Sequence, residues 1–345
     1  TALGTVTTAL ATDVTINAND AISAGTVAAA AATTVTIDGD SLATVDLSTK
    51  STAAVTLSGT AGFKDVTTGT FASFTNSSTG ASTLGADTTT AGLGTSATYA
   101  GGSGVDTVTF GAQTKAQTLG AGNDVAYLTG AALGTGGSID AGEGTDTLGL
   151  TTANAVSASA NELFEGSISN FEKLDIGATA GTGTINLANL DDISVINISG
   201  AVGHAIVLDS LADGATTTIT TSATAAVTHT LESSSGSSDK LNLVIKGSAA
   251  VTGGEQNMAN TEIITINSDD SDSTTADTDI IHTVNLDATK ATSLTVTGDA
   301  GLNIDNTGNV KITTFDASAV TGSASNVTFA SANTTTTASV SITGG

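Results

Sequence analysis

Three short segments of the chain repeat two glycines and an aspartate at one spacing, with an apolar or small residue two places later. Residues 101–109 read GGSGVDTVT, residues 119–127 read LGAGNDVAY and residues 141–149 read AGEGTDTLG. Glycine permits a tight left-handed turn that exposes backbone carbonyl oxygens, and the aspartate adds carboxylate oxygens. Oxygen atoms of this kind, about six to eight around one ion, are the ligands that Ca²⁺ prefers. The three segments therefore predict turns that bind a hard divalent cation.

The spacing of the aspartates indicates that these turns stack on one another. The pattern matches the nonapeptide G-G-x-G-x-D-x-U-x of calcium-binding β-rolls, in full at 101–109 and without the first glycine in the other two segments. The interval from Asp106 to Asp124 is two nonapeptides, or one full coil. The interval from Asp124 to Asp146 is longer than two nonapeptides, so we expect the extra residues of that coil near 132–136. Plain Gly-Asp turns without a metal are the alternative.

A second group of carboxylates is crowded into the segment DDSDSTTADTD. Its members are Asp269, Asp270, Asp272, Asp277 and Asp279. Carboxylates this close together repel one another unless water or a bridging cation separates them. A further calcium site and a solvated loop are both open for this segment.

Short alternating strands must position these turns. Val35/Ile37, Val45/Leu47 and Val55/Leu57 repeat an apolar–polar–apolar pattern at a spacing of ten residues, which is typical of short strands ended by turns. Each unit buries too few apolar side chains to be stable alone, so neighbouring units must stack and share one thin core. The sequence therefore predicts an all-β chain, an elongated parallel β-solenoid of the β-helix or β-roll type. A β-sandwich is the alternative.

Helix signals are sparse, and we expect at most one or two short helices. Asn161 is predicted to cap one of them, carrying Leu163 and Phe164. We expect three regions: a Thr/Ala-rich solenoid over 1–100, a calcium-binding β-roll over 101–150 and a further solenoid over 151–345.

Composition excludes several classes of function. The chain of 345 residues carries 33 acidic and 8 basic residues, a net charge of −25, and no cysteine. A field this negative repels nucleic acid, and no apolar run of about 18 residues is present to span a membrane. The sequence contains no H-E-x-x-H, no P-loop, no G-x-S-x-G followed by a histidine and no cysteine nucleophile. We therefore expect a protein that is not an enzyme.

The C-terminal part of the chain resembles a known family. Residues 294–334 include GLNIDNTGN followed by FDASAVTG, and this stretch resembles the lattice-forming region of Caulobacter-type crystalline surface-layer (S-layer) proteins. The resemblance extends to residues 118–148 and covers roughly residues 90–345. It implies a calcium-dependent two-dimensional lattice of identical copies on the bacterial cell surface, reached by type I secretion. It also implies anchoring to lipopolysaccharide, through a region that we expect to lie outside this chain, and the chain itself is interpreted as a central, lattice-forming fragment.

The same resemblance carries a calcium role, with several ions, onto the turn residues. These are Gly102, Gly104, Asp106, Gly120, Gly122, Asp124, Gly142, Gly144 and Asp146. Asp140 and Glu143, beside the third turn, are candidates for additional carboxylate ligands, and Asn123 in the second turn is a further candidate. Leu119 and Ala141 stand where the motif has its first glycine, so we expect the second and third turns to be weaker sites than the first. A secreted calcium-binding adhesin is the alternative function. Adhesins of this type commonly repeat long domains in tandem, and no such long repeat is present here, which favours the lattice.

Overall fold

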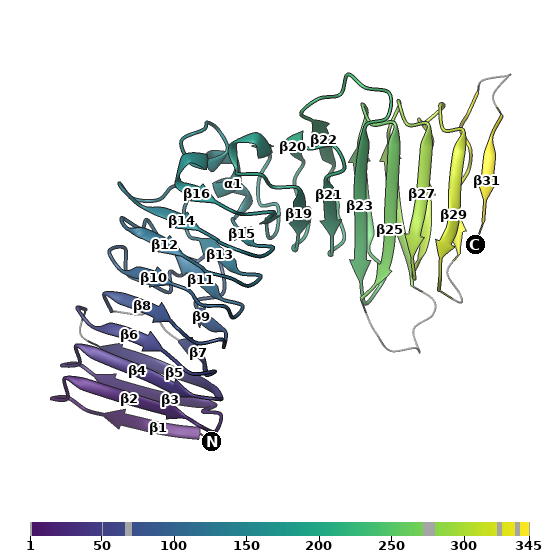
Figure 1. Ribbon diagram of the computed structural model, residues 1–345. Coiled ribbons are helices and arrows are strands. Elements are labelled where there is room, and N and C mark those ends of the chain that lie inside the picture. The colour runs from purple at the N-terminus through teal and green to yellow at the C-terminus, as the bar shows by residue number, and fades with distance from the viewer. Residues whose placement is uncertain are drawn as a thin grey trace. The chain divides into compact units, whose positions relative to one another are not determined.

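The computed structural model describes residues 2–49, 51–65, 71–271, 280–322, 326–334 and 339–344 (Figure 1). The described chain is built of short strands that pair in parallel, and consecutive strands alternate between facing sheets. This confirms the predicted all-β parallel β-solenoid. The chain divides into two compact units, which are described one at a time. None of the helices in the described ranges is long and apolar enough to cross a membrane.

The first unit comprises Thr1–Leu150, Asn161–Lys173 and Asn189–Asp191. Its odd-numbered strands lie in one sheet, in chain order: β1 (Ala2–Thr7), β3 (Ala24–Ala29), β5 (Leu42–Thr49), β7 (Gly62–Asp65), β9 (Ser82–Leu84), β11 (Thr107–Phe110), β13 (Val125–Leu128) and β15 (Thr147–Gly149). Its even-numbered strands lie in the other: β2 (Asp13–Ala18), β4 (Thr34–Gly39), β6 (Ala54–Leu57), β8 (Ser73–Asn76), β10 (Thr98–Ala100), β12 (Ala116–Thr118), β14 (Ser138–Asp140) and β16 (Ile168–Ser169). One coil of the solenoid therefore contributes one strand to each sheet.

The second unit comprises Thr151–Ala160, Leu174–Ala188 and Asp192–Gly345. Its odd-numbered strands are β17 (Lys173–Asp175), β19 (Val195–Ile198), β21 (Thr216–Ile219), β23 (Lys240–Gly247), β25 (Ile263–Asp270), β27 (Ser293–Gly298), β29 (Thr314–Val320) and β31 (Ser341–Thr343). Its even-numbered strands are β18 (Gly183–Asn186), β20 (Ile206–Leu211), β22 (Val227–Leu231), β24 (Thr252–Asn257), β26 (Ile281–Asp287), β28 (Gly301–Asp305) and β30 (Val327–Thr328). The same alternation between two sheets therefore continues within this unit.

The ten-residue spacing seen in the sequence is half a coil. Val35 and Ile37 in β4 pair with Val55 and Leu57 in β6, the next strand of the same sheet. The pair at Val45/Leu47 belongs to β5 in the other sheet, and all six side chains are buried. Each coil thus points a few aliphatic side chains inward from both sheets, where they stack on those of the neighbouring coils.

Coil length around the candidate turns also follows the sequence spacing. Thr107 pairs with Val125, so the coil between them is two nonapeptides long. Val125 pairs with Thr147, which makes the next coil longer. This longer coil takes up its extra residues in the 129–137 connection between β13 and β14. The position agrees with the insertion expected near 132–136.

The predicted position of the helix is wrong. The α-helix of the described chain, α1, spans Thr152–Ala158, and the Thr151 hydroxyl caps it by accepting from Asn154 N at 3.2 Å. Asn161 Oδ1 instead accepts from Leu163 N at 3.0 Å, a local turn that a capping residue also forms. Leu163 is 84% exposed. Short 3₁₀ turns follow at Glu165–Ser167 and Leu187–Asn189.

Aromatic side chains stack inside the first unit next to the candidate turns. Phe74 lies 5.6 Å from Phe63 and 5.6 Å from Tyr99 between ring centroids, nearly parallel to the tyrosine ring. Tyr99 meets Phe110 edge-on at 6.3 Å. All four rings are buried. They give these coils a larger apolar core than the small side chains around the rings could form alone.

Replacing Phe74 by alanine is expected to destabilise the first unit by about 3–5 kcal/mol, because it leaves a cavity between two stacked rings. Urea unfolding followed by circular dichroism measures this change. Leu163→Ala is the matched control, since that side chain is exposed and its loss should cost less than about 0.5 kcal/mol. Equal effects of the two substitutions would contradict the stacked arrangement.

A histidine in the second unit is buried within a chain of hydrogen bonds, and its burial favours the neutral form. Gln256 Nε2 donates to Gly253 O at 2.6 Å, so Gln256 Oε1 accepts from His229 Nε2 at 2.9 Å. His229 Nδ1 then accepts from the Thr217 hydroxyl, 3.3 Å away. Burial lowers the pKa of His229 from 6.5 to about 4, against a smaller opposing effect of Gln256.

The pKa of His229 predicts a loss of stability in acid. Between pH 6.5 and 4 the unfolded state binds a proton at His229 that the folded state does not, so stability falls as the pH drops. The full loss, reached below about pH 4, is on the order of 3 kcal/mol. Urea unfolding of the wild type and of His229→Gln at pH 7, 6, 5 and 4 checks this. The wild type should lose stability relative to the variant, and parallel curves would contradict the assignment.

Candidate metal centre

The three predicted Gly-Asp turns lie side by side at one corner of the first unit. Asp106, Asp124 and Asp146 stand immediately before β11, β13 and β15, which are neighbours in one sheet (Figure 1). The three side chains are fully buried, with no exposed surface. Residues from three successive coils are thereby brought into one column.

Backbone-to-carboxylate hydrogen bonds join the coils along this column. Asp106 N donates to Asp124 Oδ1, and Asp124 N donates to Asp146 Oδ1, each at 2.7 Å. Asp146 N donates in turn to Glu172 Oε2 at 2.7 Å. Each carboxylate therefore faces the coil before its own, and we call Asp106, Asp124, Asp146 and Glu172 the carboxylate ladder.

Glu172 is a member of the ladder that the sequence analysis did not identify. It stands before β17, as each aspartate stands before its own strand. The coil that separates it from Asp146 is lengthened by α1 and by the 3₁₀ turn at Glu165–Ser167. The Gly-Asp nonapeptide is absent around Glu172. The signal in the sequence that could have identified Glu172 was a carboxylate directly before a strand.

Burial makes the charged form of the three aspartates in the ladder costly. It raises the pKa of Asp106, Asp124 and Asp146, and it raises that of Asp124 to about 7, with the charges of Asp106 and Asp146 adding to the effect. Hydrogen bonds from the backbone oppose these shifts without cancelling them. A cation beside the column would favour the charged form of all three aspartates.

Two oxygen atoms of the ladder are buried and unpartnered. Asp124 Oδ2 and Asp146 Oδ2 have no hydrogen-bond partner within the described part of the chain. A buried polar atom without a partner costs free energy that a bound cation would recover. In the described ranges no three His, Cys, Asp or Glu side chains converge on one metal position, so the other ligands of an ion would have to be backbone carbonyl oxygens.

The glycines of the second and third turns allow such carbonyls to come close. Gly120, Gly122, Gly142 and Gly144 have φ values of 103°, 143°, 99° and 151°, a region that strongly favours glycine. A Cβ atom on Gly122 would lie 2.7 Å from the carbonyl oxygen of Gly104, and one on Gly144 would overlap the carbonyl oxygen of Gly122. Carbonyl oxygens of one turn therefore pack directly against the glycines of the next, and the residues present fit a calcium ion.

Gly144→Ala is expected to destabilise the first unit by about 1–3 kcal/mol or more, because alanine has to adopt a strained φ and its Cβ meets a backbone carbonyl. Thermal or urea unfolding measures the effect. Gly94→Ala is the control, since a Cβ at Gly94 would meet no atom within 4 Å. A tolerated Gly144→Ala would mean that the turns are not stacked as described.

The remaining predicted ligands of this region are exposed. Asn123 Oδ1 accepts from Thr145 N at 3.0 Å, and Asp140 Oδ1 accepts from Asn170 Nδ2 at 2.7 Å. Glu143 is exposed, and its backbone bonds to the neighbouring turn at Gly120 and Gly122. These three side chains lie outside the buried column.

The second acidic segment contributes Asp269 and Asp270 to the described residues. Asp269 forms an ion pair with Lys246 at 2.6 Å, and Asp270 N donates to Asp299 Oδ1 at 2.8 Å. Asp272, Asp277 and Asp279 lie outside the described residues. The interactions of Asp269 and Asp270 connect neighbouring strands.

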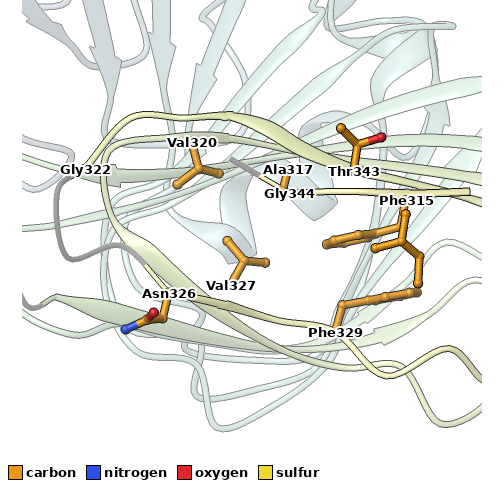
Figure 2. A pocket seen from close by; sticks show the side chains of 10 residues that line it. Phe315, Ala317, Val320, Gly322, Asn326, Val327, Phe329, Thr343 and Gly344 are labelled. Atoms are coloured by element: carbon orange, nitrogen blue, oxygen red, sulfur yellow. The ribbon is translucent and has the colours of Figure 1, made fainter.

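A pocket lies in the second unit, near the C-terminal end of the chain (Figure 2). The rings of Phe315 and Phe329 stack there with centroids 4.1 Å apart. The rest of its lining is aliphatic or small, with Asn326 and Thr343 as polar members. None of these lining residues is an acid, a base or a charged group.

No protein-family model matches the chain, and no curated protein matches it.

Proposed function

We propose that this chain is a structural protein of a bacterial surface layer, in which calcium ions between stacked turns order the solenoid and identical copies form a planar lattice. The observation that carries the calcium part is the pair of buried, unpartnered oxygen atoms, Asp124 Oδ2 and Asp146 Oδ2. The lattice part is supported by the resemblance of residues 118–148 and 294–334 to surface-layer proteins.

Calcium suits the donor atoms of this corner better than other metals do. The donors are carboxylate and carbonyl oxygens, without the histidine or cysteine ligands that zinc, copper and iron sites commonly use. Magnesium demands a near-ideal octahedron and keeps several waters, whereas calcium accepts irregular shells of six to eight oxygens. When bound, calcium supplies charge compensation to the carboxylates. The protein itself excludes water from the carboxylates of Asp124 and Asp146 and orients them along the column.

The charge of the chain makes such ordering responsive to calcium. A net charge of −25 opposes compaction, and three of the carboxylates that contribute to it, those of Asp106, Asp124 and Asp146, are buried. An ion that binds only the folded chain contributes its binding free energy to folding. Extracellular calcium modules bind at about 10⁻⁴–10⁻³ M, so a chain of this kind would fold outside the cell, where calcium is plentiful. Type I secretion, a cell-surface location and lipopolysaccharide anchoring through another region belong to the same proposal.

No catalytic step is part of the proposal. The three aspartate carboxylates of the ladder are buried, and each accepts a hydrogen bond from a backbone N–H group. The residues that line the pocket near the C-terminal end are uncharged. The chain would act through its surfaces, as one copy contacting the next.

Calcium titration of the purified chain tests the calcium part. At a calcium concentration about 100 times the dissociation constant, the free energy of unfolding should rise by about 2.7 kcal/mol per site. Asp124→Asn and Asp146→Asn should each weaken this rise, because a neutral amide is a poorer ligand. Asp20→Asn, at an exposed position, should leave it unchanged. Unfolding that is indifferent to calcium would contradict the proposal.

Electron microscopy of the same samples distinguishes the surface-layer function from the alternative adhesin function. Ordered sheets that appear with calcium and disappear with a chelator are expected of a surface-layer protein. A folded, calcium-bound chain that stays monomeric at high concentration would favour the adhesin.

A further inference from the structure

The first Gly-Asp turn, 101–106, differs in backbone conformation from the two that follow it. Gly120 and Gly122, and likewise Gly142 and Gly144, have φ values in the left-handed region. The corresponding Gly102 and Gly104 do not. The segment with the complete nonapeptide is therefore the one whose turn departs from the common shape.

The carboxylate of this turn is also satisfied in a way that the others are not. Asn76 Nδ2 donates to Asp106 Oδ1 at 3.1 Å and lies 3.3 Å from Asp106 Oδ2. Ser82 N donates to Asp106 Oδ1 at 2.7 Å, and the Tyr99 hydroxyl is hydrogen-bonded to the same carboxyl group. Asp124 and Asp146 each keep one oxygen without a partner in the described part of the chain. Both oxygens of Asp106 thus have hydrogen-bond partners within the protein.

The Asn76 amide occupies the space between the first turn and the coil before it. Its Nδ2 also donates to Gly80 O at 3.1 Å, and its Oδ1 accepts from Ser78 N at 2.9 Å. The residue is 3% exposed. A Cβ on Gly102 would lie 3.3 Å from Asn76 Cγ, so the asparagine packs directly against the turn. The donor group of the amide is surrounded by carboxylate and carbonyl oxygens, the environment that a cation would otherwise have.

We infer that the Asn76 amide takes the place of a calcium ion at the first turn, so that ions bind at the Asp124 and Asp146 turns and none binds at the Asp106 turn. This inference rests on the proposed calcium binding by the two later turns. An amide donates two hydrogen bonds at about 3 Å, whereas calcium requires oxygens at about 2.3–2.6 Å. The row of ion sites therefore ends at the Asp124 turn. The Asp106 turn is ordered without a metal ion because the Asn76 side chain fills it.

Calcium stoichiometry of the full chain, measured by isothermal titration, tests this inference. Asp106→Asn should bind as many ions as the wild type, whereas Asp124→Asn should bind one fewer. Asn76→Asp should place a second carboxylate opposite Asp106. That variant should be less stable than the wild type in chelator, and with calcium it should bind one ion more and regain its stability.

The outcomes distinguish the inference from the proposed function. Loss of an ion in Asp106→Asn, matching the loss in Asp124→Asn, would overturn the inference and leave calcium binding standing. An Asn76→Asp variant that is folded in calcium, by circular dichroism, yet binds no extra ion would overturn it as well. If that variant fails to fold, Asp106→Asn alone decides. A wild-type chain that binds no calcium would overturn both.

Discussion

Each coil of a parallel solenoid must bond to the coils beside it, and at the corner before β11, β13 and β15 that bond runs from a backbone N–H to a carboxylate. Adjacent strands lie about 4.8 Å apart, so residues at equivalent corners are forced into a column whatever their charge. Asp106, Asp124 and Asp146 are aligned in this way, each held by a 2.7 Å hydrogen bond across coils. The bond fixes one oxygen of each carboxylate and leaves the second to be satisfied by something else. The partner of that second oxygen, a protein group or an ion, decides how each turn is stabilised.

The rest of the first unit is consistent with this requirement. Glycines at 120, 122, 142 and 144 let one backbone approach the next without a side chain between them. The aromatic rings of Phe63, Phe74 and Tyr99 stack, and Phe110 meets Tyr99 edge-on. The Tyr99 hydroxyl and the Asn76 amide both reach Asp106. Protein groups therefore stabilise one end of the ladder. In the middle of the ladder, two buried carboxylate oxygens are without such groups in the described chain.

The sequence predicted those features that repeat at a regular spacing. Apolar pairs ten residues apart specified the solenoid, since that spacing is half a coil. The interval from Asp106 to Asp124 predicted that the Gly-Asp turns stack on one another, and the longer interval from Asp124 to Asp146 located the insertion. The partners of the column were missed because they lie outside the repeated motif and coils of irregular length separate them: Asn76 reaches Asp106, and Glu172 reaches Asp146. The helix was misplaced because Asn161 forms a local turn while Thr151 provides the cap.

Long-wavelength anomalous diffraction from crystals of the chain grown with calcium would test the central claim most directly. The account predicts anomalous peaks beside Asp124 Oδ2 and Asp146 Oδ2, each within about 2.3–2.6 Å of the oxygen. Ordered turns with no anomalous peak beside either aspartate would contradict it.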